Sequence, residues 1–147
     1  MSPDALRVAF VCVQNAGRSQ MATAFAEQER RERDLAAEVE ILTGGTRPAD
    51  HLHDVVVDVM ADAGFDLTER TPRAISPEEL ADTDVVVTMG CSAADVCPAT
   101  WSGENRDWDL EDPEGKSPED VRAIREEVRR RVRDFFDEIE QGVPRRV

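Results

Sequence analysis

The chain has 147 residues, of which 40% are hydrophobic and 34% charged, a composition typical of one globular domain with a packed core. Its net charge of −14, from 32 acidic and 18 basic residues, argues against a nucleic-acid binder, which needs a basic face. No apolar run reaches the length of a membrane span and the N-terminus lacks the pattern of a signal peptide, so we expect a single cytoplasmic domain over residues 1–147 that binds no membrane.

Strand and helix patterns alternate along the first half of the chain. Residues 6–11 form an apolar run with β-branched members, which predicts a buried strand. Residues 19–33 are rich in helix formers with one apolar face, and residues 39–45 predict a short strand that glycines stop. Apolar residues at helical spacing predict a second helix, with Asp50 as its cap and Gly64 as its stop.

The second half of the chain continues the alternation. The stretch SPEE at residues 76–79 is a capping box with proline at the first helical position. Residues 84–90 form an apolar run, as a parallel strand covered on both faces would, and residues 107–110 are a candidate for a short fourth strand. The stretch SPED at residues 117–120 caps a last helix. Its expected core face is Val121, Ile124, Val128, Val132, Phe135, Phe136 and Ile139.

Strands separated by helices predict an α/β fold with three layers, in which a four-stranded parallel sheet carries helices on both faces. In such folds the ligand crevice lies beyond the carboxyl ends of the strands. The segments that follow residues 6–11, 84–89 and 107–110 all fall at that edge. We therefore expect three distant segments to contribute to one site.

The segment from Cys12 to Ser19 has the form of a cysteine, five residues, an arginine and a serine. A loop that wraps a tetrahedral oxyanion presents backbone N–H groups inward and runs into a helix N-terminus, which adds partial positive charge. We expect Arg18 to hold two oxyanion oxygens with its planar fork, and the positive surroundings to favour a nucleophilic thiolate at Cys12. Ser19 would donate a hydrogen bond to that thiolate, and Gly17 would let the backbone approach the anion. The alternative is that Cys12 is a small buried residue and Arg18 a surface cation.

Residues 8–25, VAFVCVQNAGRSQMATAF, resemble the signature of the low-molecular-weight protein tyrosine phosphatase superfamily and, more narrowly, that of its thioredoxin-coupled arsenate reductases. The resemblance covers most of the chain and implies that fold, with no cofactor and with arsenate or a phosphate-type oxyanion as substrate. It implies that Asn15 holds the shape of the loop and that Asp112, placed before Pro113, is the general acid. The residues expected around the oxyanion are Val13, Gln14, Asn15, Ala16, Gly17, Arg18 and Ser19.

Two further cysteines, Cys91 and Cys97, follow the strand expected at residues 84–90. A reductase passes two electrons to arsenate: one thiol attacks the oxyanion, a second displaces it, and a third carries the disulfide outward to a thioredoxin-like or other dithiol reductant. The three cysteines of the chain match these steps, whereas a phosphatase needs only one. Inert core thiols and metal ligands are the alternatives, although this cysteine spacing is unusual for zinc. We expect no metal, and we predict that His51 and His53 are solvated on the polar side of their helix.

These residues favour an arsenate reductase in which Cys12 attacks, Asp112 protonates the leaving group, and the other two cysteines complete the relay. The alternative enzyme is a low-molecular-weight phosphatase that acts on phosphotyrosine or a small aryl phosphate through a phosphocysteine. The chain has no tyrosine, so it offers few aromatic side chains that could pack against a phosphotyrosine ring. A binding module that senses an oxyanion or redox state without turnover is a third alternative, which a retained Asp112 disfavours.

The distribution of charge supports a separate inference. The acidic residues are spread along the chain rather than gathered in a tail, and Lys116 is the only lysine. This composition resembles that of proteins from extreme halophiles. The alternative is an ordinary acidic cytoplasmic protein.

We expect the melting temperature to be higher in molar KCl than at about 0.1 M, where the screening length is still about 10 Å. At molar salt that length falls to about 3 Å, which removes most of the mutual repulsion of the acidic residues. Thermal unfolding across a KCl series measures the effect. A melting temperature that stays flat or falls with KCl would refute the halophilic interpretation and leave the catalytic one untouched.

Overall fold

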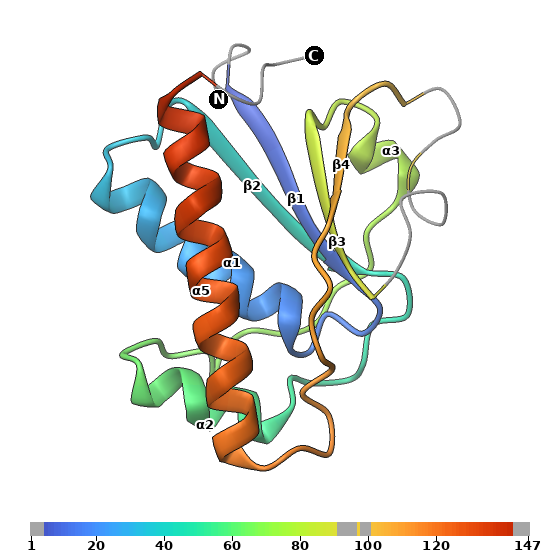
Figure 1. Ribbon diagram of the computed structural model, residues 1–147. Helices are drawn as coiled ribbons and strands as arrows, with labels where there is room; N and C mark the ends of the chain where they lie inside the picture. Colours follow the sequence, from blue (N-terminus) through green and yellow to red (C-terminus); the bar gives the residue numbers. More distant parts are fainter. Residues whose placement is uncertain (1–4, 91–96, 98–100, 143–147) are drawn as a thin grey trace.

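The structure is a computed structural model that describes residues 5–90, residue 97 and residues 101–142. Its centre is one parallel sheet with the strand order β2-β1-β3-β4 and helices on both faces, so the predicted three-layer α/β fold is confirmed (Figure 1). The strands are β1 (Leu6–Cys12), β2 (Val39–Gly45), β3 (Val85–Met89) and β4 (Glu104–Asp107). The helices are α1 (Arg18–Glu32), α2 (Asp54–Asp62), α3 (Pro77–Leu80) and α5 (Pro118–Glu140).

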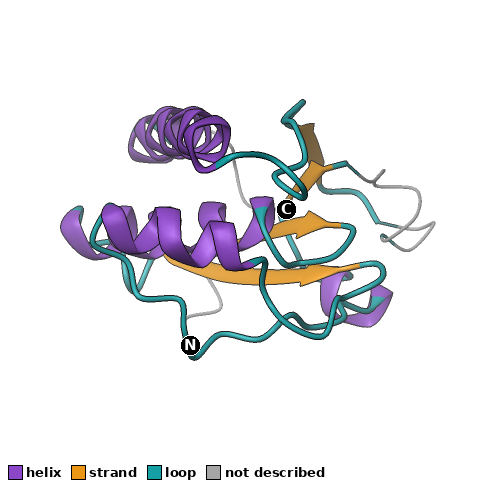
Figure 2. Ribbon diagram, turned by 90° about the horizontal axis from the view of Figure 1, so that it is seen from below, coloured by secondary structure: helices purple, strands orange, loops and turns teal. Residues whose placement is uncertain are grey.

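Side chains of the sheet alternate between two apolar clusters, because successive residues of a strand point to opposite faces. Phe10 and Cys12 belong to the larger cluster, to which α1, α2 and α5 contribute. Ala9 and Val11 belong to the smaller cluster, to which α3 contributes Leu80. The two faces of the sheet are therefore covered unequally, with α3 apart from the other three helices (Figures 1 and 2).

The C-terminal helix α5 follows its sequence pattern closely. Its N-cap is Ser117, whose hydroxyl accepts a hydrogen bond from Asp120 N at 3.2 Å, and Pro118 occupies the first helical position. The helix packs on α1 and α2. Its expected core face is confirmed: six members are buried, and Ile139 is partly buried against the same core.

The fourth strand lies earlier in the chain than expected. The prediction of a strand at residues 107–110 is wrong, because β4 spans Glu104–Asp107 and pairs in parallel with β3. β4 lies at the edge of the sheet, where pairing uses the backbone and polar, exposed side chains are tolerated. In the predicted stretch, Trp108 is buried and packs on Phe10, with ring centroids 5.9 Å apart.

The start of α2 also differs from the prediction. The N-cap is His53 rather than Asp50, and the His53 side chain makes no capping hydrogen bond. The residues before α2 run beside the loop after β1 instead, through backbone hydrogen bonds. Gly64 directly follows the C-cap Ala63, so the predicted end of the helix is confirmed. In the described part of the chain, no helix is both long and apolar enough to cross a membrane.

Candidate active site

The loop that joins β1 to α1 lies at the carboxyl edge of the sheet. Cys12 is the last residue of β1 and is paired with Gly45 of β2 and Met89 of β3. Residues 13–17 connect it to Arg18, the first residue of α1. The loop therefore opens at the edge where parallel α/β sheets bind their ligands.

The Cys12 sulfur is buried beside two hydrogen-bond donors. The backbone N–H of Asn15 donates to Sγ at 3.1 Å, and Ser19 Oγ lies 2.8 Å from Sγ. Ser19 Oγ also accepts a hydrogen bond from Asn15 Nδ2 at 2.7 Å, which leaves its own proton free to point at the sulfur. Two donors directed at one sulfur suit a cysteine that carries negative charge, which is the nucleophilic form.

Asn15 sits in the middle of the loop in a left-handed conformation, with a φ of +53° and a buried side chain. Asparagine adopts this conformation more readily than most residues, because its short side chain can hydrogen-bond locally. Its Nδ2 also donates to Thr43 Oγ1 at 3.0 Å, and its Oδ1 accepts from Gln20 Nε2 at 2.9 Å and from Arg73 N at 3.0 Å. The Asn15 side chain therefore joins the loop to α1, β2 and the segment before α3.

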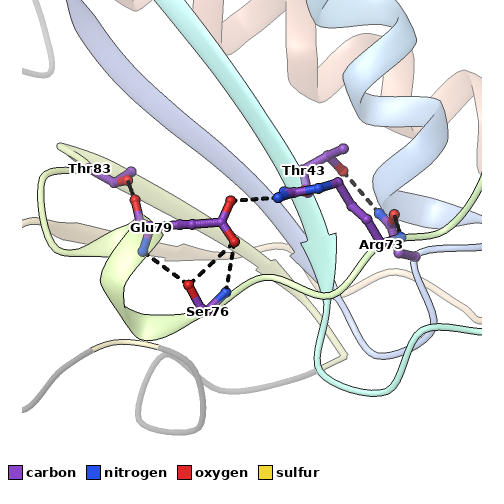
Figure 3. A network of polar contacts seen from close by, with 6 residues as sticks. Thr43, Arg73, Ser76, Glu79 and Thr83 are labelled. Atoms are coloured by element: carbon purple, nitrogen blue, oxygen red, sulfur yellow. Dashed lines mark hydrogen bonds and ion pairs between the residues drawn. The ribbon is translucent and has the colours of Figure 1, made fainter.

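A second polar network lies beside Asn15, between β2 and α3 (Figure 3). Arg73 donates from Nη1 to Thr43 O at 2.7 Å and from Nη2 to Glu79 Oε2 at 2.6 Å. Glu79 closes the capping box of α3 with Ser76, and its hydrogen bond from Arg73 holds the pKa of the Glu79 carboxyl below its ordinary value. Sequence reasoning found the capping box but missed Thr43 and Arg73, since no local motif marks their contacts with Asn15.

The segment after β2 turns the carbonyl groups of the loop outward. In a trans peptide the N–H points opposite to the preceding carbonyl, so a carbonyl bound on the outside leaves the next N–H facing inward. This applies to the N–H groups of residues 13, 14, 15 and 17, and the Asn15 N–H does face the Cys12 sulfur. The four bonds run from Thr46 N to Cys12 O at 3.2 Å, Arg47 N to Val13 O at 2.8 Å, Ala49 N to Gln14 O at 3.0 Å and His53 N to Ala16 O at 3.1 Å.

The Arg18 guanidinium lies between the segments that follow β3 and β4. Its Nη1 donates to Leu110 O at 3.2 Å, and its Nη2 lies 3.7 Å from Asp112 Oδ2. Gly90, directly after β3, has a φ of +88°, and a Cβ there would lie 2.8 Å from Arg18 Nη1. A larger residue at position 90 would therefore strain the backbone and displace the guanidinium.

The segment that carries Asp112 closes over the start of α1. The Asp112 side chain is 52% exposed, and its Oδ1 accepts a hydrogen bond from Glu114 N at 3.0 Å. Pro113 approaches Gly17 so closely that a Cβ on Gly17 would lie 2.6 Å from Pro113 Cγ. The φ of Gly17, −142°, is outside the left-handed region. The close approach of Pro113 therefore favours glycine at position 17 without any need for a left-handed backbone.

The two histidines differ in their surroundings. His51 is exposed, as predicted. The prediction that His53 is solvated is wrong, because its side chain is only 18% exposed and a Cβ on Gly17 would lie 3.4 Å from its Cδ2. The later start of α2 explains the difference: His53 ends the extended segment beside the loop instead of lying on a helical surface.

Cys97 packs on the other face of the sheet from Cys12. Its side chain is partly buried against the smaller apolar cluster, its thiol is free, and burial raises the pKa of that thiol above its ordinary value. Cys91 lies outside the described residues. Of the predicted catalytic residues, Cys12 and Arg18 lie at the two ends of one loop, Asp112 lies beside Arg18, and Cys97 lies on the other face of the sheet. Among the described residues, no group of histidine, cysteine and acidic side chains could hold a metal ion.

Comparison with known sequences supports a family assignment. The family described as low molecular weight phosphotyrosine protein phosphatase matches residues 7–145. A protein of Halobacterium salinarum, provisionally named as an arsenate reductase, is 58% identical over 94% of this chain and 96% of its own length. A glutaredoxin arsenate reductase of Synechocystis is 32% identical over 90% of this chain and 98% of its own.

Solved structures show the same architecture. The thioredoxin-dependent arsenate reductase of Corynebacterium glutamicum has a TM-score of 0.77 at 30% identity, over 97% of this chain and 65% of that one. An arsenate reductase in the phosphate-binding state has a TM-score of 0.75 at 31% identity, over 91% of this chain and 98% of that one. A low-molecular-weight phosphotyrosine phosphatase of Vibrio cholerae has a TM-score of 0.81 at 19% identity, over 94% of this chain and 99% of that one. This likeness shows a shared fold.

Replacing Arg18 by lysine should weaken oxyanion binding and slow turnover by about 10- to 100-fold, because lysine keeps the charge but loses the fork that donates to two oxygens. Calorimetric titration with inorganic phosphate and steady-state kinetics measure the two effects. Arg122→Lys is the matched control, since Arg122 forms an ion pair with Asp62 away from the loop. Near wild-type values for Arg18→Lys would show that Arg18 does not hold the oxyanion.

Proposed function

This chain belongs to the low molecular weight phosphotyrosine protein phosphatase family, and we propose that it is a cytoplasmic arsenate reductase. It would work through Cys12 and a disulfide relay. The observation that carries the proposal is the Cys12 sulfur, which lies beside Asn15 N and Ser19 Oγ within a loop of inward N–H groups. Two further cysteines, in a chain that is 58% identical to a provisionally named arsenate reductase, favour reduction over hydrolysis.

In the first step the Cys12 thiolate attacks the arsenic of bound arsenate and forms an S–As bond. Arg18 and the N–H groups of the loop stabilise the charge on the oxygens that remain. Protonated Asp112 donates its proton to the hydroxyl that leaves the arsenic as water. Asp112 Oδ2 lies 3.7 Å from Arg18 Nη2, which supports this role, because the general acid and the arginine that binds the oxygens would then face the same oxyanion.

In the second step a thiolate at Cys91 attacks the Cys12 sulfur. A disulfide forms, the S–As bond breaks, and its electron pair stays on arsenic, which is released as arsenite. Cys97 then attacks the Cys91 sulfur, which frees the Cys12 thiolate and leaves a disulfide between the other two cysteines. An external dithiol protein reduces that disulfide. The thioredoxin and glutaredoxin in the names of two relatives support a reductant of that class.

The position of Cys97 supports the order of these exchanges. Cys12 belongs to the cluster beside α1 and Cys97 packs against the cluster beside α3, so the two thiols face opposite sides of the sheet. A thiol that follows β3, as Cys91 does in the sequence, would connect them. Because burial raises the pKa of the Cys97 thiol, the thiolate fraction at neutral pH is small, and its attack should become faster as pH rises.

A phosphatase is the second candidate. The family description and the shared fold with a phosphotyrosine phosphatase favour it. With the same roles for Cys12, Arg18 and Asp112, the reaction would pass through a phosphocysteine that water then hydrolyses. The chain has no tyrosine to build aromatic walls, so a small aryl phosphate fits this candidate better than a phosphotyrosyl peptide.

Cys91→Ser and Cys97→Ser should each stop multiple-turnover arsenate reduction while hydrolysis of p-nitrophenyl phosphate stays nearly intact, because hydrolysis needs no second thiol. Cys97→Ser should release about one arsenite per enzyme and then stall with Cys12 bridged to Cys91, whereas Cys91→Ser should release almost none. Arsenite release and aryl phosphate hydrolysis are assayed side by side in molar KCl, and mass spectrometry identifies the trapped disulfides.

The wild-type enzyme is the control for both reactions. After one turnover without reductant it should contain a disulfide between Cys91 and Cys97. Full reductase activity in both variants, with both thiols free after turnover, would make the phosphatase the better assignment. Rapid hydrolysis without any arsenite from the wild type would lead to the same conclusion.

A further inference from the structure

The ring of His53 lies close to two segments of the proposed active site, the oxyanion loop and residues 112–114. A Cβ placed on Gly17 would lie 3.4 Å from His53 Cδ2 and 2.6 Å from Pro113 Cγ, so both rings approach the same point at the start of α1. The Nε2 atom of His53 also lies 4.0 Å from Glu114 Oε2. The ring therefore adjoins both the oxyanion loop and the segment that carries Asp112.

The backbone of His53 is fixed on the loop side. Its N–H donates to Ala16 O at 3.1 Å, the last of the four bonds that turn the loop carbonyls outward. Its own carbonyl accepts from Val56 N and Val57 N in the first turn of α2. The ring thus projects from a position anchored to the loop at one end and to a helix at the other.

The side chain of Asp112 is held only by weak contacts. The Asp112 carboxyl is 52% exposed, accepts a hydrogen bond from Glu114 N within the same turn, and lies 3.7 Å from Arg18. The neighbouring Glu114 carboxylate is 57% exposed. Its 4.0 Å separation from His53 Nε2 is too long and too solvated to hold the segment. The rings of His53 and Pro113, by contrast, both lie close to Gly17, within 3.4 Å of the place that a Cβ there would take.

We propose that His53 is a positioning residue for the general acid: its ring supports residues 112–114 above the oxyanion loop and so keeps the Asp112 carboxyl within reach of the departing oxygen. This inference rests on the proposed acid role of Asp112 and does not depend on whether the substrate is arsenate or an aryl phosphate. His53 acts through packing, not through ion pairing. Removal of the ring should leave Cys12 and the loop N–H groups in place but allow residues 112–114 to move away from the loop.

A double-mutant cycle of His53→Ala and Asp112→Asn tests this role. It is run on whichever reaction the wild type catalyses, arsenite release or p-nitrophenyl phosphate hydrolysis. His53→Ala should lower kcat by about tenfold, since a displacement of about 1 Å can cost up to two orders of magnitude in rate. In the Asp112→Asn background the same change should have almost no further effect, because the acid that His53 positions is already gone.

Three further measurements separate positioning from a general structural role. The dissociation constant for inorganic phosphate and the rate of Cys12 alkylation by iodoacetamide should stay unchanged in His53→Ala, because both report on the loop alone. His53→Phe, which keeps a flat aromatic ring but cannot form an ion pair, should recover most of the lost kcat. His51→Ala, the exposed histidine two positions earlier, is the matched control and should behave as the wild type.

Each outcome bears on a distinct claim. Additive effects in the cycle, an unchanged kcat in His53→Ala, or a parallel loss of phosphate binding would overturn the positioning role. Full activity of Asp112→Asn would overturn the acid role, and the role of His53 with it. Hydrolysis without arsenite release would overturn only the arsenate assignment, and the cycle would still decide the role of His53.

Discussion

A buried asparagine in a left-handed conformation is the constraint on which the site depends. The amide of Asn15 connects the nucleophile loop to α1 through Ser19 and Gln20, and to β2 through Thr43. Its backbone N–H donates to the Cys12 sulfur. A buried amide of this kind is stable only when its donors and acceptors are all paired, so the surrounding elements must lie where they do. The shape of the loop is thus a property of the packed domain rather than of the loop itself.

The site is assembled from segments that are distant in the sequence but meet at one edge of the parallel sheet. The segment after β2 turns the loop carbonyls outward, the segment after β3 makes room for Arg18 at Gly90, and the segment after β4 brings Asp112. Pro113 lies close to position 17 and the Arg18 guanidinium lies close to position 90, which explains why glycine occurs at both. The same sheet separates Cys12 from Cys97, so that a relay between them must pass around its edge.

Much of this arrangement is predictable from local pattern. The alternation of strands and helices predicts the sheet, and the spacing from Cys12 to Arg18 predicts a loop at a strand end. Local pattern does not predict the features that depend on contacts between segments distant in the sequence. The polar strand β4 is stabilised by its backbone pairing with β3, so it carries no apolar signature. The sequence predicts His53 on a helical surface, because its helical spacing is visible there and its proximity to the loop is not. The sequence does not indicate Thr43 or Arg73, because their contacts with Asn15 join segments that are distant in the sequence.

The claim that the sulfur of Cys12 attacks the oxyanion can be tested with the Cys12→Ser variant in a single-turnover assay. A serine hydroxyl stays protonated where a thiolate would form, so we expect neither arsenite release nor aryl phosphate hydrolysis. The melting temperature of the variant should remain close to that of the wild type, since the substitution replaces one small buried side chain by another. Substantial turnover by folded Cys12→Ser in either assay would contradict the assignment of this loop as the catalytic centre.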